Sequence, residues 1–225
     1  MILTNRLFER EKPSKEAKSI YIFCEGIKRE FQYFDYFKEL DSRINVEIYK
    51  LHPHDDNSPT GLLSIAKKSI LKTKKNPNPK YSFQKNDEVW IVLDTDRNKH
   101  KSRKPKIREV YDFCRGKEGW YAAQSNPCFE VWLSYHKSTE RLKFEGDETC
   151  KKWKQKVDSL FSGGFDPRRH PILIGDAIEN SEDNFGTKSD APIKGSTEVF
   201  MLGKVINRVL KKKINRVRSR INQDN

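Results

Sequence analysis

The stretch VWIVLDTDRN, residues 89–98, joins five consecutive apolar residues to two closely spaced carboxylates. An apolar run of this length, bounded by polar residues, predicts a buried strand of a parallel sheet. Asp94 and Asp96 are two positions apart, and side chains with that spacing point to the same side of a strand. Two neighbouring acids repel unless a cation lies between them, and a divalent metal ion is the usual partner. By itself, the pair is more typical of a solvated strand end that opens a turn.

A second apolar run, SIYIFC at residues 19–24, also ends on an acid, in Glu25-Gly26. Gly26 allows the tight turn or positive φ that a junction between strand and helix often needs. Helical spacing of Phe31, Phe34, Phe37 and Leu40 follows. The rest of the chain up to residue 133 continues this alternation, with strands expected over 45–51 and 120–124 and helices over 58–71, 107–114 and 127–133.

Strands that alternate with helices predict the α/β class, here a Rossmann-like, mostly parallel, four-stranded sheet with helices on both faces. Pro127 is expected in the first turn of the helix that follows the fourth strand. In such sheets ligands bind beyond the carboxyl ends of the strands. Glu25, Asp94, Asp96 and Glu130 all come just after an expected strand, which favours a site over a simple turn.

Three regions are expected along the 225 residues. Residues 1–17 are polar and predict a flexible arm, and residues 18–140 form the α/β domain. Residues 141–225 form a helical and irregular extension that packs on this core, with helices over 147–161 and from Ser196 onward. The turn-rich stretch 163–195 carries no pattern that assigns it, and the basic residues 211–213 suit a helix C-terminus.

The chain carries 45 Lys plus Arg against 32 Asp plus Glu, a formal charge of +13. Clustered positive charge without an apolar anchor favours nucleic acid over a membrane as partner. No apolar run reaches the length of a membrane span or an export signal, and Cys24, Cys114, Cys128 and Cys150 lack metal-site spacing. A reduced, cytoplasmic protein is therefore expected. Motifs typical of NTP hydrolysis, dinucleotide binding and serine hydrolases are missing from the sequence.

Basic residues begin directly after the acid pair. We predict substrate binding for these and for one amide: Arg97, Lys99, Lys101, Arg103, Lys104, Lys106 and Asn126. A basic rim beside bare carboxylates is what a site for a polyanion needs. The alternatives are a solvated loop for the basic residues and a helix cap for Asn126.

Four motifs occur together: CEGIKREFQYF (24–34), DEVWIVLDTDRN (87–98), SNPCFEVWLSYH (125–136) and GSTEVF (195–200). In this order they resemble the RloB family of prokaryotic Toprim-fold proteins associated with defence loci, over roughly residues 19–210. SNPCFE is the most distinctive of them. The departures are Thr95 between the two aspartates and an unusually basic segment after Asp96, and neither removes an expected ligand.

The resemblance implies a metal-dependent nuclease, cutting DNA or RNA in antiviral or abortive-infection defence with Mg²⁺ or Mn²⁺. Glu25, Asp94, Asp96 and Glu130 are then the catalytic and metal-binding residues, while Glu130 is equally suited to complementing the helix dipole. Glu30 is a further candidate, although at a helix start five residues after Glu25 it is more often an exposed or capping acid. The alternative is a non-catalytic nucleic-acid-binding or regulatory Toprim protein with a vestigial or structural metal site. Other defence-locus proteins are candidate partners, and the oligomeric state stays open, with a homodimer among the alternatives.

Overall fold

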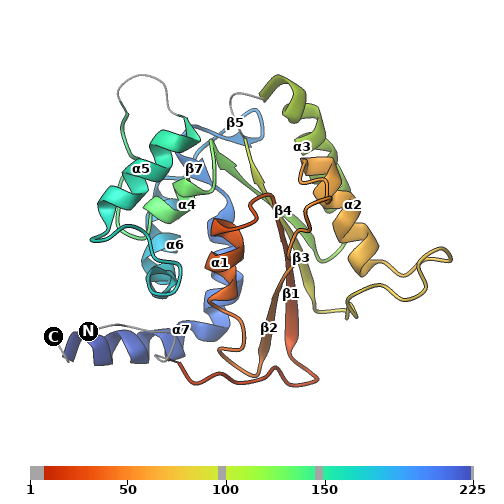
Figure 1. The fold of residues 1–225 in the computed structure, drawn as a ribbon, viewed down its shortest axis with the longest axis horizontal. Helices are drawn as coiled ribbons and strands as arrows, with labels where there is room; N and C mark the ends of the chain where they lie inside the picture. Colours follow the sequence, from red (N-terminus) through yellow and green to blue (C-terminus); the bar gives the residue numbers. More distant parts are fainter. Residues whose placement is uncertain (1–7, 96–99, 145–148, 224–225) are drawn as a thin grey trace.

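A mostly parallel sheet forms the centre of the molecule (Figure 1). The computed structural model describes residues 8–95, 100–144 and 149–223. The sheet order is β2-β1-β3-β4-β7, in which the first four strands are parallel and β7 is antiparallel to β4. The bounds are β1 (Lys18–Cys24), β2 (Ile44–Ile48), β3 (Glu88–Asp94), β4 (Trp120–Asn126) and β7 (Ser196–Thr197). The predicted α/β class is confirmed, and the sheet has one strand more than expected.

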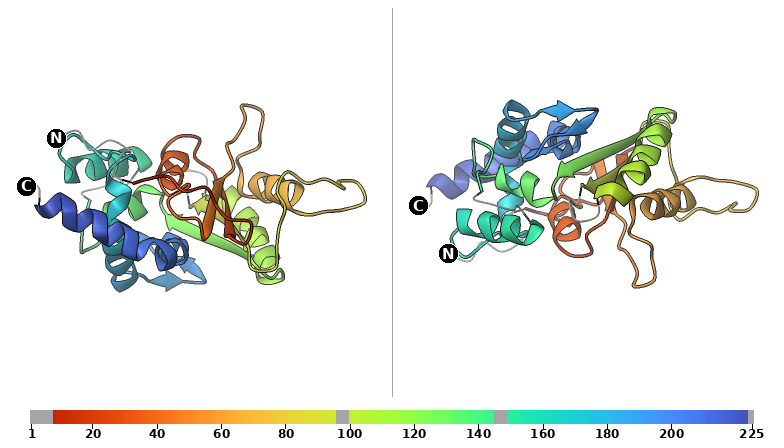
Figure 2. Two further views of the ribbon diagram at one scale, coloured as in Figure 1. Left: turned by 90° about the horizontal axis from the view of Figure 1, so that it is seen from below. Right: turned by 90° about the horizontal axis from the view of Figure 1, so that it is seen from above.

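Helices cover both faces of the sheet, as Figure 2 shows. The helices α2 (Pro59–Ile70) and α3 (His100–Arg115) pack on one face. The other face carries α1 (Arg29–Asp35), α4 (Glu130–Ser134), α5 (Cys150–Leu160), α6 (Ile174–Asp183) and α7 (Val199–Gln223). A short 3-10 helix (His170–Leu173) precedes α6, and a hairpin of β5 (Thr187–Lys188) and β6 (Ala191–Pro192) precedes β7. None of the helices within the described residues combines the length and apolarity needed to cross a membrane.

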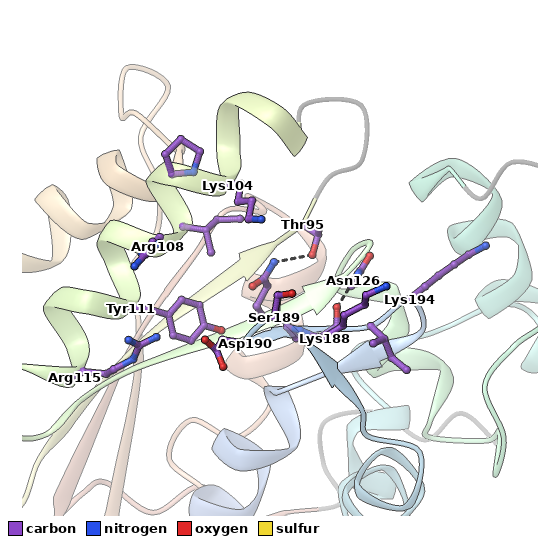
Figure 3. Close-up of a pocket in the computed structure, with 16 residues that line it drawn as sticks. Thr95, Lys104, Arg108, Tyr111, Arg115, Asn126, Lys188, Ser189, Asp190 and Lys194 are labelled. Carbon is purple, nitrogen blue, oxygen red and sulfur yellow. Dashed lines mark hydrogen bonds between the residues drawn. The ribbon is translucent and has the colours of Figure 1, made fainter.

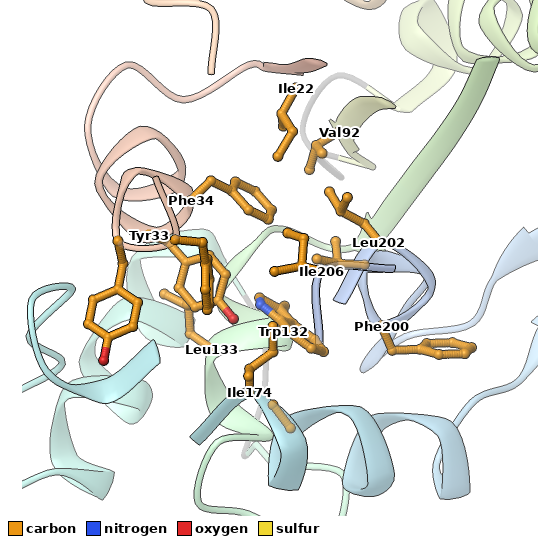
Figure 4. Packing of buried hydrophobic residues seen from close by; sticks show 14 of the residues in the cluster. Ile22, Tyr33, Phe34, Val92, Trp132, Leu133, Ile174, Phe200, Leu202 and Ile206 are labelled. Atoms are coloured by element: carbon orange, nitrogen blue, oxygen red, sulfur yellow. The ribbon is translucent and has the colours of Figure 1, made fainter. Parts of the chain in front are cut away.

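Two apolar cores follow from the alternation of side chains along the central strands. Ile20 and Ile22 face α1 and α7, whereas Tyr21 and Phe23 face α2 and α3. This two-sided burial explains why β1 and β3 read as continuous apolar runs. Figure 4 shows the first core, where Trp132 of α4 lies among side chains of α1, β1, β3 and α7. Residues from 150 onward therefore share a core with the sheet.

The structure corrects three local expectations. The basic segment is helical from His100 onward, with Pro105 inside α3, rather than a loop up to residue 106. Pro127 does not open a helix: it follows a cis peptide bond from Asn126, and α4 begins at Glu130. Ser196 belongs to β7 instead of the last helix, which begins at Val199. The start of α2 was right, since Ser58 caps it and Pro59 is its first residue.

One buried histidine makes the first core sensitive to acid. The Nε2 atom of His136 lies 3.0 Å from the Tyr33 hydroxyl, and Nδ1 lies 3.2 Å from the carbonyl oxygen of Trp132. These contacts fit a neutral ring that donates from Nδ1 and accepts at Nε2. Burial lowers the pKa of His136 from 6.5 to about 3, and the nearby His170 acts in the same direction.

We expect this histidine to reduce stability as the pH falls through the window between 6.5 and about 3. In that window the unfolded chain binds a proton at His136 that the folded chain excludes, so unfolding is favoured. From pH 7.5 to about pH 5 the contribution should amount to about 2 kcal/mol. Urea unfolding of wild type and His136→Gln at both pH values measures it. Between these two pH values, His136→Gln should lose about 2 kcal/mol less free energy of unfolding than wild type. His54→Gln, at an exposed loop position, should lose as much as wild type.

Candidate active site

Four carboxylates gather at the carboxyl edge of the sheet and are here called the acid cluster: Glu25, Glu30, Asp94 and Glu130. Burial raises the pKa of Asp94 well above its ordinary value, and the negative charges of Glu30, Glu25 and Glu130 raise it further. Burial also raises the pKa of Glu25 to about 7, although Arg103 acts against this. Mutual coupling of this kind requires the acids to lie close together. A catalytic or metal-binding role for Glu25, Asp94 and Glu130 stays a prediction.

The backbone brings Glu25 and Asp94 together. Strands β1 and β3 are parallel neighbours that pair Cys24 with Val92, so both end at the same edge. The backbone N–H of Asp94 then donates to Glu25 Oε1 at 3.3 Å. On the other side, Thr95 is fixed to β4, because its hydroxyl donates to the Ser125 carbonyl at 3.0 Å and accepts from Gln124 at 2.7 Å. Neighbouring strands therefore hold the chain on both sides of the Asp94 side chain.

Glu30 belongs to the cluster because of Gly26. Burial and the charge of Glu130 raise the pKa of Glu30. A Cβ atom on Gly26 would lie only 1.8 Å from Glu30 Oε2, so the glycine leaves the space that this carboxylate occupies. Gly26 is not among the described residues with positive φ, and room for Glu30 is the requirement that the structure shows. From the sequence, Glu30 was expected more often to be an exposed or capping acid than a member of the site; its spacing of four from Gly26 is the signal that relates the two.

Three cations surround these acids. Arg103 forms an ion pair with Glu25 and also donates to the backbone carbonyl of Asp94 at 3.0 Å. Its side chain is only 11% exposed, so Arg103 helps to hold Glu25 and Asp94 in place, and a contact with substrate stays a prediction. Arg29 and Lys154 each lie 3.8 Å from Glu130 Oε1. The side chain of Glu130 is only 5% exposed, which requires such partners.

The remaining predicted residues divide into two groups. Asp96, Arg97 and Lys99 lie outside the described residues, as does the side chain of Lys101. Lys104 and Lys106 are exposed on α3. Within the described residues, no three side chains of the metal-binding types are arranged to hold one ion. A shared coordination point that includes Asp96 therefore stays a prediction, while the all-oxygen donor set of the acid cluster suits Mg²⁺ or Mn²⁺.

A pocket of about 860 Å³ lies beside the acid cluster, between α3 and the β5–β6 hairpin (Figure 3). Its floor includes Thr95, Gln124 and Asn126 at the ends of β3 and β4. Tyr111 of α3 also lines it and donates to the buried carboxylate of Glu198, which accepts from the Gln124 backbone N–H at 3.0 Å. This pocket was not predicted, because its hairpin lies in the turn-rich stretch whose sequence carries no assignable pattern.

Asn126 joins the floor of this pocket to its hairpin wall. Its side-chain amide donates to the Pro192 carbonyl at 2.7 Å, and its backbone carbonyl accepts from Gly195 at 2.8 Å. The neighbouring Ser125 and Thr197 hydroxyls lie 2.8 Å apart across the β4–β7 pair. The motifs SNPCFE and GSTEVF therefore contact each other where β4 pairs with β7. Asn126 does not cap α4, which begins four residues later and whose N-cap is Phe129.

Comparison with known proteins gives one family. A family model described as RloB-like protein matches residues 20–206. This range begins within β1 and continues through β7 into the first turns of α7. No curated protein and no solved structure matches the chain significantly.

Proposed function

The chain belongs to the RloB-like protein family, and from this premise we propose that it is a metal-dependent nuclease of the Toprim type, acting on DNA or RNA. The observation that supports this most is the acid cluster at the carboxyl edge of the sheet, where Asp94 shares its surroundings with Glu25, Glu30 and Glu130. So many acids at one edge are costly to hold together unless they serve a cation. The basic pocket beside them supplies the attraction for a polyanion.

The proposed chemistry is phosphodiester hydrolysis. Bound Mg²⁺ or Mn²⁺ would neutralise charge that develops on the phosphate oxygens and lower the pKa of an attacking water. Asp94 would hold the ion together with Asp96, as the family resemblance implies. Glu25 would be a further ligand or transfer a proton, in an orientation that its ion pair with Arg103 sets. Glu30 and Glu130 would complete the negative site.

We infer the biological setting from the family resemblance. Antiviral or abortive-infection defence is the proposed role, with other defence-locus proteins as partners and a homodimer as one assembly to test. A cytoplasmic location fits the cysteines, since no disulfide joins the four of them, all within the described residues.

One observation favours a second candidate, a non-catalytic nucleic-acid-binding or regulatory protein. Arg103 already neutralises Glu25, and Arg29 and Lys154 approach Glu130. Cations from the chain itself therefore offset part of the negative charge, so that a metal ion is not needed for the cluster to persist.

A cleavage panel separates the two candidates. Purified protein is incubated with single-stranded and duplex DNA, messenger RNA and transfer RNA, each with Mg²⁺, Mn²⁺ or EDTA, while calorimetry measures metal binding. We expect metal-dependent cleavage of at least one substrate. Nucleic acids left intact under every condition would reject the nuclease, and metal binding without cleavage would select the second candidate.

The exposed lysines of α3 give a further expected result. Replacing Lys104 and Lys106 with alanine should weaken nucleic-acid binding and lower the slope of log affinity against log salt by about 2, because each lysine contact releases about one counterion. Binding titrations between 50 and 200 mM salt measure the slope. The matched control is Lys67→Ala/Lys68→Ala, which removes the same charge from α2 instead of α3. A slope equal to that of the control would assign Lys104 and Lys106 to solubility.

A further inference from the structure

We propose that the pocket between α3 and the β5–β6 hairpin binds one unpaired nucleotide of a nucleic-acid strand whose neighbouring phosphate lies at the acid cluster. The inference rests on the proposed function and deepens it, because it names a single-stranded or locally unpaired substrate.

The first step is the position of the pocket. Asp94 and Thr95 are consecutive, and side chains of consecutive residues in an extended chain point to opposite sides. Asp94 interacts with Glu30 and Glu130 on the α1 and α4 side, whereas Thr95 interacts with Gln124 and lines the pocket on the α3 side. A strand that crosses the carboxyl edge of the sheet can therefore reach the acid cluster and the pocket with adjacent nucleotides.

The second step is the chemistry of the lining. Five basic residues and one acid, Asp190, surround the pocket: Lys104, Arg108, Arg115, Lys188 and Lys194. Between them lie apolar surfaces from both walls: Pro105, Ile107, Ala191, Pro192 and Ile193. Thr95, Gln124 and Asn126 add polar groups at the floor. Positive charge at the rim fits phosphate, and apolar walls with a few polar groups fit a nucleobase.

The third step is size and rigidity. A volume of about 860 Å³ is typical of a small-molecule site and accepts one nucleotide. In a duplex the bases are stacked and paired, so a nucleotide has to be unstacked and flipped out before it can enter, which costs free energy. An unpaired strand avoids this expense. The hairpin wall is fixed in place by the two hydrogen bonds of Asn126, so the pocket exists before the strand binds.

The test measures binding without cleavage. Asp94→Asn protein in EDTA is titrated with a fluorescent 12-nucleotide single strand and with the same sequence as a duplex. We expect the single strand to bind at least about tenfold more tightly, since stacking of one base contributes about 1–3 kcal/mol. Adding Arg108→Ala and Lys188→Ala should remove most of this preference. Adding Lys211→Ala and Lys212→Ala, the same charge change on the exposed surface of α7, should preserve it.

Three results would overturn the proposal: equal affinity for duplex and single strand, equal effects of the pocket and α7 double variants, or displacement of the strand by micromolar mononucleotides. The last result would make the pocket a site for a free nucleotide. Cleavage assays keep this proposal separate from the proposed function. If wild-type protein cuts nucleic acid and the pocket variants cut all forms at the wild-type rate, the nuclease proposal stands and the pocket proposal fails. If the protein never cuts nucleic acid but the pocket variants lose the preference for single strands, the pocket proposal stands and the nuclease proposal fails.

Discussion

Replacing Asp94 with asparagine is expected to abolish cleavage and, in the same protein, to raise the melting temperature without metal. Asparagine keeps the shape of the side chain but removes the charge that would hold Mg²⁺ or Mn²⁺. Loss of metal charge stabilisation is worth several kcal/mol, so the rate should fall by about 10³-fold or more. The gain in stability follows because Asp94 sits among three other carboxylates, and burial and these charges raise its pKa well above its ordinary value.

The sign of the stability change can be worked out from that pKa. At pH 7.5 the unfolded chain ionises Asp94 freely, whereas the folded chain opposes ionisation, so the carboxylate destabilises the fold. The neutral amide removes this penalty. A gain of about 1 kcal/mol corresponds to roughly 2–4 °C in melting temperature for a chain of this size. Thermal melts in EDTA at pH 7.5, with cleavage assays on the same preparations, measure both effects.

Asp41→Asn is the matched control. This aspartate is paired with Arg43 through two side-chain contacts of 2.8 Å, and the hydrogen bond from Arg43 lowers its pKa. The same substitution there should leave cleavage unchanged and should not raise the melting temperature. A fall in the melting temperature of metal-free Asp94→Asn protein would contradict the crowding of acids around Asp94. Cleavage that continues at the wild-type rate would remove Asp94 from the site.

Patterns with a short period were enough to predict the centre of the fold. The apolar runs of β1 and β3 are long because both faces are buried, and an acid marks the end of each: Glu25 directly follows β1, and Asp94 is the last residue of β3. Elements held mainly by distant contacts were missed. Strand β7 has only two residues, and its residue Ser196 pairs with Asn126, which lies 70 positions earlier in the chain. The hairpin that walls the pocket is fixed by the same residue, so no local pattern reveals it.

Side chains with two plausible uses were the second source of error. Arg103 stands in a run of basic residues, and only the fold shows that it pairs with Glu25 and is largely covered while Lys104 remains exposed. Pro127 is compatible with a helix start, yet it precedes α4 by three residues. Composition near a site therefore predicts that charge is present, whereas the packing of α3 on the sheet decides which charges face the acids.

Replacing Gly26 tests whether Glu30 belongs to the acid cluster. We expect Gly26→Ala to reduce cleavage about 10–100-fold, the range typical of lost support around a metal site. A methyl group there would lie 1.8–2.2 Å from the carboxyl atoms of Glu30, so this carboxylate has to leave the cluster. Glu30→Ala should cause a similar loss, because it removes the same group. The measurement is the cleavage rate at saturating metal.

The double variant Gly26→Ala/Glu30→Ala tests whether the two substitutions reduce cleavage for the same reason. If Gly26 matters because it makes room for Glu30, then adding Gly26→Ala to Glu30→Ala should cause little further loss, since the atoms that would clash are gone. Additive losses would instead mean that Gly26 serves the backbone between β1 and α1. Gly175→Ala in α6 is the control for the substitution itself, because the nearest atom to its added methyl lies 4.0 Å away. That variant should cut at the wild-type rate and gain about 0.5–1 kcal/mol of stability, as expected for alanine in place of glycine within a helix.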